Sequence, residues 1–148
     1  MDRLEFCARA AQVGFTPQIL AKLTHTTAQQ AASWLDTAWD VPVPATVVFA
    51  LREAEAAQDK AVKCALDLVL KKTKPGAVNK RISLPYWKSQ NEYVGIHPHH
   101  TSCDYRMINA QNIALAHALS AYGYQVRWMA PEPRVAYKLS QDDHGINA

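Results

Sequence analysis

The sequence lacks the features that mark membrane, secreted and most catalytic proteins. No apolar run reaches the roughly eighteen residues of a membrane-spanning helix, and no charged stretch followed by an apolar one marks a secretory signal. The three cysteines stand far apart without a CxxC pair, which argues against a disulfide framework and favours reduced thiols. There is no glycine-rich phosphate loop, nucleophile elbow or paired-carboxylate motif. We therefore expect a cytoplasmic protein that is not an enzyme, needs no cofactor and makes no membrane contact.

The sequence does have enough apolar material for a core, and a mild excess of positive charge. With 49% hydrophobic residues in 148, the chain can bury one generous domain or two small ones. A net charge of +3 permits nucleic-acid binding without requiring it, so the placement of residues along the chain must decide.

Residues 14–35, GFTPQILAKLTHTTAQQAASWL, predict two short helices joined by a tight turn. Thr16 stands where an N-cap belongs and Pro17 occupies the first helical position, where its missing N–H costs nothing. The first helix should therefore run from Pro17 to about Thr24. Its apolar stripe consists of Ile19, Leu20 and Leu23.

A second helix start follows immediately. Thr27 and Gln30 fit a capping box, in which each side chain satisfies the other residue's backbone N–H, so the second helix should begin at Ala28. Helices of about eight residues are marginal alone, so the pair must pack against neighbours. The positions expected to face inward are Ala31, Trp34 and Leu35. The outer face is uncharged and consists of Ala28, Gln29, Ala32 and Ser33.

Two interpretations fit this pair of helices. One is a helical hairpin within an α-helical bundle, and the other is a helix-turn-helix that binds DNA. The short turn, the two caps and the outward polar side chains favour DNA, since glutamine and serine suit adenine edges and phosphates. We expect Gln29 and Ser33 at base edges and Ala28 against a thymine methyl group. The residues expected to fix the register on phosphates are Thr16, Lys22, Thr27 and Gln30.

This stretch resembles the helix-turn-helix of the lambda repressor and Cro class. The matching positions are Gly14, Phe15, Thr16, Leu20, Ala21, Leu23, Thr27 and Trp34. Two positions depart from that class: His25 replaces the usual turn glycine, and Leu35 with Asp36 replaces the usual Glu-Asn. Histidine is among the residues that tolerate the left-handed backbone conformation, so the turn remains feasible.

The sequence predicts helices on both sides of this pair. Asp2 and Glu5 fit a capping box before a helix from Arg3 to Val13, with an apolar set of Leu4, Phe6, Ala8, Ala11 and Val13. Residues 36–44 are irregular, and Trp39 and Val41 are expected to cover the edge of the core. A long helix should run from Ala45 to about Lys72, with an apolar face of Val47, Leu51, Ala54, Ala61, Ala65 and Val69. Its second half must pack against a second chain or the C-terminal half.

The rest of the chain predicts a small α/β unit. A linker is expected over residues 73–81 and an irregular histidine-rich loop over 96–103. The expected elements are a strand at 81–87, a helix at 90–94, a helix at 104–122 ended by Gly123, a strand at 124–129 and a strand at 134–139. The longer helix should bury Ile108, Leu115, Leu119 and Tyr122. The predicted division is a DNA-binding domain at 1–72, the linker at 73–81, a dimerisation domain at 82–140 and a disordered tail at 141–148.

The segments LPYW and DYRMINA, together with the long helix after VPVP, resemble the YdiL-like proteins and the related anti-CRISPR-associated (Aca) repressors of phages and mobile elements. The resemblance implies a mainly α fold with a small α/β part. Specifically, it implies an N-terminal lambda-repressor-like helix-turn-helix domain that binds an inverted repeat, and a C-terminal α/β domain that forms the homodimer. It also implies a homodimeric transcriptional repressor that binds double-stranded DNA and acts on its own operator.

Two alternatives use the C-terminal half. The first is an RNA-binding or toxin–antitoxin module with a basic aromatic surface, although the same aromatics would also serve as core and dimer contacts. Its residues would be Arg81, Trp87, Lys88, Arg106, Arg127, Trp128 and Lys138. The second is a metal-dependent hydrolase or nuclease with a histidine general base beside Asp104. Its candidate zinc ligands are His97, His99, His100 and Cys103, but neighbours on one loop rarely complete a tetrahedron, so we expect no metal.

Overall fold

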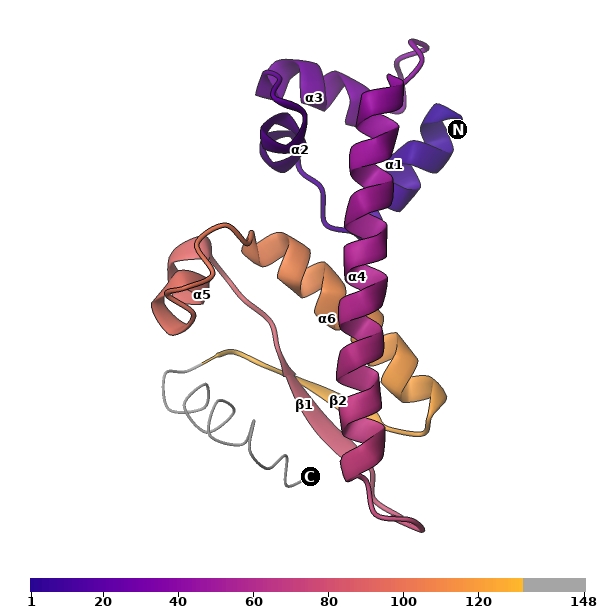
Figure 1. Ribbon diagram of the computed structural model, residues 1–148, viewed down its shortest axis with the longest axis vertical. Helices are drawn as coiled ribbons and strands as arrows, with labels where there is room; N and C mark the ends of the chain where they lie inside the picture. The colour runs from indigo at the N-terminus through magenta and orange to yellow at the C-terminus, as the bar shows by residue number, and fades with distance from the viewer. Residues whose placement is uncertain (132–148) are drawn as a thin grey trace. The chain divides into compact units, whose positions relative to one another are not determined.

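The computed structural model describes residues 1–131, which form a mainly helical fold with one small parallel sheet (Figure 1). In chain order the elements are α1 (Arg3–Gln12), α2 (Pro17–Thr24), α3 (Ala28–Leu35), α4 (Ala45–Lys72), β1 (Arg81–Pro85), α5 (Gln90–Ile96), α6 (Tyr105–Ala121) and β2 (Gln125–Met129). The predicted strand at 134–139 and the predicted tail at 141–148 lie outside the described residues. Within the described part, no helix is both long enough and apolar enough to span a bilayer.

The chain divides into two compact units, and the division falls inside α4. The first unit is Met1–Asp59 and the second begins at Lys60. The prediction that α4 is one unbroken helix of 28 residues is confirmed, as is its buried face at Val47, Leu51 and Val69. The residues of α4 after Lys60 pack on the C-terminal elements of the same chain, which is one of the two partners expected for them.

The core of the first unit is built from all four of its helices. Its buried residues are Phe6, Ala10, Val13, Phe15, Ile19, Leu20, Ala21, Ala31, Trp34, Val47 and Leu51. On α1 the buried positions are spaced by four and three residues, which is one helical face. The prediction that Leu4, Ala8 and Ala11 belong to this face was wrong, because all three are exposed, Leu4 to 68%. Leu4 and Ala8 each lie two positions from Phe6 and therefore about 200° around the helix.

Three further apolar residues of this unit were wrongly assigned to the core. Leu23, Trp39 and Val41 are all about half exposed or more. Leu23 has the angular position of the inner face of α2, so its exposure comes from its place at the end of the helix. In the irregular segment after α3, the Asp36 carboxylate accepts from the Ala38 N–H, and the Val41 carbonyl accepts from Arg3. The contact from Arg3 to the Val41 carbonyl therefore ties this segment to α1.

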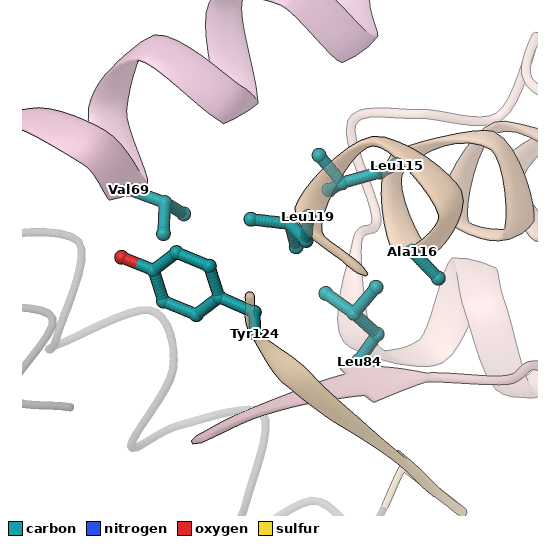
Figure 2. Close-up of a cluster of buried hydrophobic side chains, with 6 residues drawn as sticks. All are labelled: Val69, Leu84, Leu115, Ala116, Leu119 and Tyr124. Carbon is teal, nitrogen blue, oxygen red and sulfur yellow. The ribbon is translucent and has the colours of Figure 1, made fainter. Parts of the chain in front are cut away.

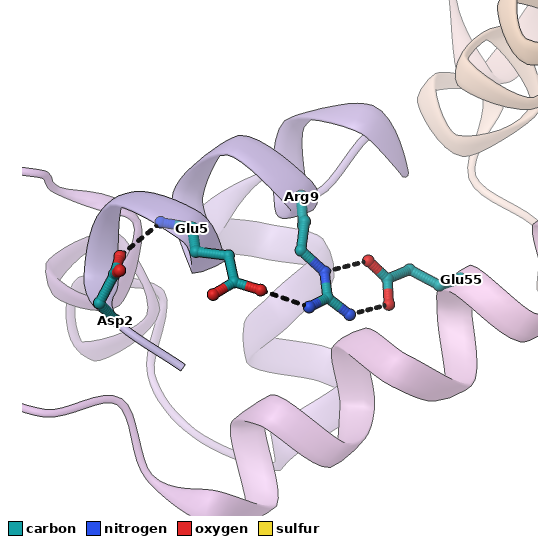
Figure 3. A network of polar contacts seen from close by, with 4 residues as sticks. All are labelled: Asp2, Glu5, Arg9 and Glu55. Carbon is teal, nitrogen blue, oxygen red and sulfur yellow. Dashed lines mark hydrogen bonds and ion pairs between the residues drawn. The ribbon is translucent and has the colours of Figure 1, made fainter.

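A network of ion pairs joins α1 to α4 (Figure 3). The Arg9 side chain on α1 bonds to Glu55 on α4: its Nε and Nη2 donate to the two carboxylate oxygens of Glu55 at 2.6 Å each. Its Nη1 donates to Glu5 on α1 at 2.8 Å. The hydrogen bonds from Arg9 hold the pKa of the Glu55 carboxyl below its usual range, with the charges of Arg9 and Arg52 acting in the same direction. Because Glu5 is engaged with Arg9, only the Asp2 half of the predicted capping box forms, with Asp2 accepting from the Glu5 N–H at 2.8 Å.

Replacing Glu55 should make the stability of this unit less dependent on pH. A carboxylate whose pKa is lowered by folding contributes stability above its unfolded pKa and loses it as the pH falls through its folded pKa. Glu55→Gln should therefore lower the urea midpoint at pH 7, and the difference from wild type should shrink below the usual glutamate range. Glu53→Gln, an exposed carboxylate on the same helix, is the control. If Glu55→Gln lowers the urea midpoint by the same amount at pH 7 and below the usual glutamate range, the ion pair with Arg9 does not explain the loss.

The core of the second unit lies between α4, α6 and the sheet (Figure 2). Its buried residues are Val69, Leu84, Leu115, Ala116, Leu119 and Tyr124. The strands β1 and β2 are parallel, with Ile82 opposite Val126 and Leu84 opposite Trp128. Gly123 ends α6 at a φ of 84°, in the left-handed position that the sequence predicted for it. Tyr122 was expected inside but is about half exposed, because it is already the cap residue after α6.

Two buried asparagines of α6 fix the chain as it leaves β1. The Asn109 amide accepts from the Trp87 N–H and donates to the Trp87 carbonyl, both at 2.8 Å. Asn112 donates to the Pro85 carbonyl at 3.0 Å. Trp87 therefore bonds to α6, and the strand predicted to reach it ends at Pro85 in the part of the chain that the structure describes.

Candidate nucleic-acid interface

The predicted caps of α2 and α3 are confirmed. The Thr16 hydroxyl accepts from the Ile19 N–H at 3.3 Å, and the Thr27 hydroxyl accepts from the Gln30 N–H at 3.1 Å. The return bond from the Gln30 side chain, which a complete capping box would have, is not formed within residues 1–131. The Gln30 amide is exposed instead, so it stays available to a ligand. Each capping hydroxyl also keeps its hydrogen, which can be donated to a phosphate oxygen.

The turn between the two helices is three residues long and is closed by backbone hydrogen bonds. His25 has φ 54° and ψ 43°, the left-handed conformation expected at this position. The N–H groups of His25 and Thr26 both donate to the Ala21 carbonyl, and the Thr24 hydroxyl donates to the Leu20 carbonyl at 2.7 Å. The two bonds to the Ala21 carbonyl close the end of α2, so the start of α3 is fixed relative to α2.

A glycine at position 25 should stabilise this turn. A left-handed backbone costs an L-residue roughly 1–2 kcal/mol, and glycine loses part of that gain through its greater freedom in the unfolded chain. We expect His25→Gly to raise the free energy of unfolding by about 1 kcal/mol, measured by urea titration. His25→Ala keeps the Cβ and should show no such gain. A glycine variant no more stable than the alanine variant would contradict the left-handed turn.

The first turn of α3 presents an uncharged polar surface. Ala28, Gln29 and Gln30 are exposed, while Ala31 and Trp34 face the core, as predicted. Ser33 is different, because it is partly buried and its hydroxyl donates to the Gln30 carbonyl at 2.6 Å. With its hydrogen used inside the helix, Ser33 retains only acceptor capacity toward a base edge or any other ligand.

Charge is scarce around α2 and α3. Between residues 10 and 35, Lys22 is the only lysine or arginine, it is exposed, and there is no aspartate or glutamate. Across residues 1–59 there are four lysines and arginines against seven aspartates and glutamates, a formal charge of −3. The exposed surface of the helix pair is therefore locally neutral to positive within an acidic unit. A ligand of such a surface would be bound by hydrogen bonds more than by attraction between charges.

The proposed RNA surface is divided by the fold. Trp87 is 3% exposed and belongs to the core of the second unit. Arg127 and Trp128 are neighbours on β2, so their side chains leave opposite faces of the sheet. Trp128 lines a groove beside α6 with Ile113 and His117. Surfaces that stack RNA bases combine aromatic and cationic groups on one face, and Arg127 is not on the face of Trp128. Arg81, Lys88 and Arg106 are exposed, and Lys138 lies outside the described residues.

The histidine-rich segment packs as an aromatic cluster. The rings of His97 and His100 are stacked with centroids 5.2 Å apart, and His100 Nδ1 lies 3.0 Å from the Tyr93 hydroxyl. Burial raises the pKa of Tyr93, and the nearby Cys103 raises it further. Within residues 1–131, no three potential ligands gather where they could hold a metal ion, and His99 is exposed. In the described residues this segment is therefore a cluster of packed rings around Tyr93.

Arg3 is a residue at this site that the sequence did not indicate. Its guanidinium lies at the C-terminal end of α3 and donates to backbone carbonyls there. The contacts link positions about thirty residues apart, and no local sequence pattern around Arg3 predicts them. No protein-family model matches the chain, and no curated protein matches it. The residues and their geometry therefore carry the functional argument.

Proposed function

We propose that residues 14–35 form a helix-turn-helix that reads double-stranded DNA, with α3 as the recognition helix. The observation that supports this best is the first turn of α3, where Ala28, Gln29 and Gln30 are exposed, uncharged and held by a capped start and a closed turn. A solvated surface helix usually carries charged residues on its outer face, whereas base edges are read by amides and small apolar groups.

In the proposed complex, the start of α3 enters the major groove. The Gln29 amide forms a bidentate pair with the N6 and N7 atoms of adenine, and Ala28 contacts a thymine methyl group. Thr16, Thr27 and Gln30 stand at the starts of α2 and α3, where free backbone N–H groups and the helix dipoles favour phosphates. Ser33, reduced to an acceptor by its bond to Gln30, would receive a hydrogen bond from an adenine or cytosine amino group.

Because charge is scarce around α2 and α3, phosphate contacts should contribute less of the DNA affinity than base contacts do. Each phosphate neutralised by a cation adds roughly 0.9 to the slope of log affinity against log salt. Because Lys22 is the only lysine or arginine between residues 10 and 35, binding by the helix pair should depend only weakly on salt. Discrimination between sequences must then come mainly from base contacts.

We further propose that the protein is a homodimeric repressor that binds an inverted repeat. One α3 offers a single reading turn, and two copies related by a twofold axis would place two such turns in successive major grooves, ~34 Å apart. Light scattering should then give twice the chain mass of 16.5 kDa at micromolar concentration. A monomer under those conditions would contradict the dimer and the palindromic operator together.

The DNA reading itself can be tested without knowing the operator. The full-length protein would be used to select duplexes from a random-sequence library, and the enriched sequence would be compared with a scrambled duplex. We expect an enriched inverted repeat, termed here the selected duplex. A library that shows no enrichment over successive rounds would leave the bundle interpretation of α2 and α3 as the better account.

A further inference from the structure

The C-terminal end of α3 is held by one side chain from α1. Arg3 Nη1 donates to the carbonyls of Ser33 and Trp34 at 2.7 and 3.0 Å, and Nη2 donates to the carbonyl of Val41. A weaker contact of 3.5 Å reaches the Asp36 carbonyl. One guanidinium thus joins the last turn of α3 to the irregular segment that leads into α4.

The end of α3 has no closure of its own. The cap residue Asp36 is extended, at φ −90° and ψ 117°, so the left-handed turn that usually satisfies the last carbonyls is missing. The last turn of α3 also contains no basic residue. Arg3 supplies both the missing donors and the positive charge that a helix C-terminus favours.

A second residue of α1 acts at the same place. Cys7 is one turn after Arg3, and its Sγ lies 3.6 Å from the Trp34 carbonyl. Burial raises the pKa of this thiol, which keeps it in the neutral form that can donate. Arg3 and Cys7 therefore form a joint from α1 to the end of α3, defined here as the α1–α3 joint.

Arg3 has no comparable role within its own helix. It is the first residue of α1, where a positive charge opposes the helix dipole. It forms no ion pair with an acidic side chain among residues 1–131, unlike Arg9 on the same helix. Its Nε is buried and has no hydrogen-bond partner among the described residues, a cost that the other contacts of the guanidinium offset.

We propose that Arg3 is a positioning residue for DNA reading: it sets the angle at which α3 presents Gln29, without touching DNA itself. This inference rests on the proposed function, since it names what holds the proposed recognition helix in place. The start of α3 is held by the closed turn after α2, and Arg3 holds the carbonyls of its last turn, so removing the Arg3 donors lets the end of the helix shift about its start. Base contacts suffer from such a pivot more than phosphate contacts, because a bidentate pair requires closer alignment.

The test uses Arg3→Met, which keeps most of the side-chain volume but removes the donors. The matched control is Arg9→Met, which removes an equally large cation from the same helix but breaks contacts to α4 instead of α3. Both variants of the full chain would be titrated against the selected duplex and a scrambled duplex. Arg3→Met should weaken binding to the selected duplex roughly tenfold, the loss expected for a hydrogen bond from a charged donor. Arg9→Met should change it less than about twofold.

Three further readouts separate positioning from other roles. The salt slope of Arg3→Met should equal that of wild type, since a phosphate contact would lower it by about one. Arg3→Lys should restore part of the affinity, because an ammonium group can still donate to these carbonyls. In a Gln29→Ala background, Arg3→Met should have little further effect, since coupled residues are not additive.

The possible failures are distinguishable. If wild type enriches a duplex and Gln29→Ala weakens its binding, but Arg3→Met binds as well as Arg9→Met does, the positioning role is wrong and the proposed function stands. If wild type enriches nothing, the proposed function fails and the role of Arg3 in DNA reading fails with it. Hydrogen exchange checks the joint without DNA: amides of α3 should exchange faster in Arg3→Met than in Arg9→Met, and equal rates would refute the anchor.

Discussion

Gln29→Ala should weaken binding to the selected duplex by roughly 5- to 150-fold. A bidentate pair between glutamine and adenine discriminates by about 1–3 kcal/mol, and each 1.4 kcal/mol corresponds to a factor of ten. Gln29 is exposed on the first turn of α3, directly after the Thr27 cap, which is the part of a recognition helix that reaches base edges. Binding to scrambled DNA should hardly change, because phosphate charge determines it.

The control for this variant is Lys22→Ala. Lys22 is exposed in the last turn of α2, and its loss should weaken binding to selected and scrambled duplexes alike. It should also reduce the salt slope by about one. Titrations of both variants at two salt concentrations separate base reading from phosphate contact. If Gln29→Ala binds the selected duplex as wild type does, residues 28–33 are not the reading surface.

The second large effect is expected in the core of the C-terminal unit. Leu119 on α6 is 0% exposed and belongs to the buried cluster with Val69, Leu84 and Tyr124. Leu119→Ala removes three carbon atoms and leaves a cavity that a close-packed core cannot fully refill. We expect the free energy of unfolding to fall by about 2–5 kcal/mol, measured by urea titration.

Leu68→Ala is the matched control for this substitution. Leu68 lies on α4, next to the buried Val69 in sequence, but it is 53% exposed. The same change of side chain should therefore alter the free energy of unfolding by less than about 0.5 kcal/mol. Comparable losses for the two variants would show that the face of α4 turned toward α6 has been assigned incorrectly.

Helix starts were predictable from the sequence because their causes are local. Thr16, Thr27 and Ser89 each precede a helix by one position and accept a hydrogen bond from the N–H three residues later. Asp104 was taken as the first residue of its helix, but it is the cap of α6. These signals depend on a few neighbouring residues, so the bounds of α2 and α3 followed from the sequence alone.

Contacts between distant residues could not be derived in this way. The pairing of Asn109 with the backbone of Trp87 spans 22 positions, and the pattern around Asn109 is that of any helix with a polar side. Leu4 was misassigned because apolar character does not tell which side of a short helix another helix will cover. Whether a helical residue is buried depends on which element packs against it, and that packing depends on the whole fold.

In the candidate site, one feature was predictable from the sequence and two were not. The position of Gln29 could be predicted, because the cap at Thr27 sets which residues form the first turn of α3. The hydrogen bond from Ser33 to the Gln30 carbonyl could not, because a serine in a helix either faces solvent or bonds back to its own backbone. The role of Arg3 was also hidden, since the carbonyls that it binds lie on another helix.

If α3 reads DNA sequence, the chain must bind one duplex far more tightly than another, and the ratio of two affinities measures this difference. Wild-type protein would be titrated against the selected duplex and a scrambled duplex of equal length at the same salt concentration. The account predicts that the selected duplex binds at least about 1,000-fold more tightly, the lower end for specific recognition. Equal affinity for the two duplexes, or no binding to either, would contradict it.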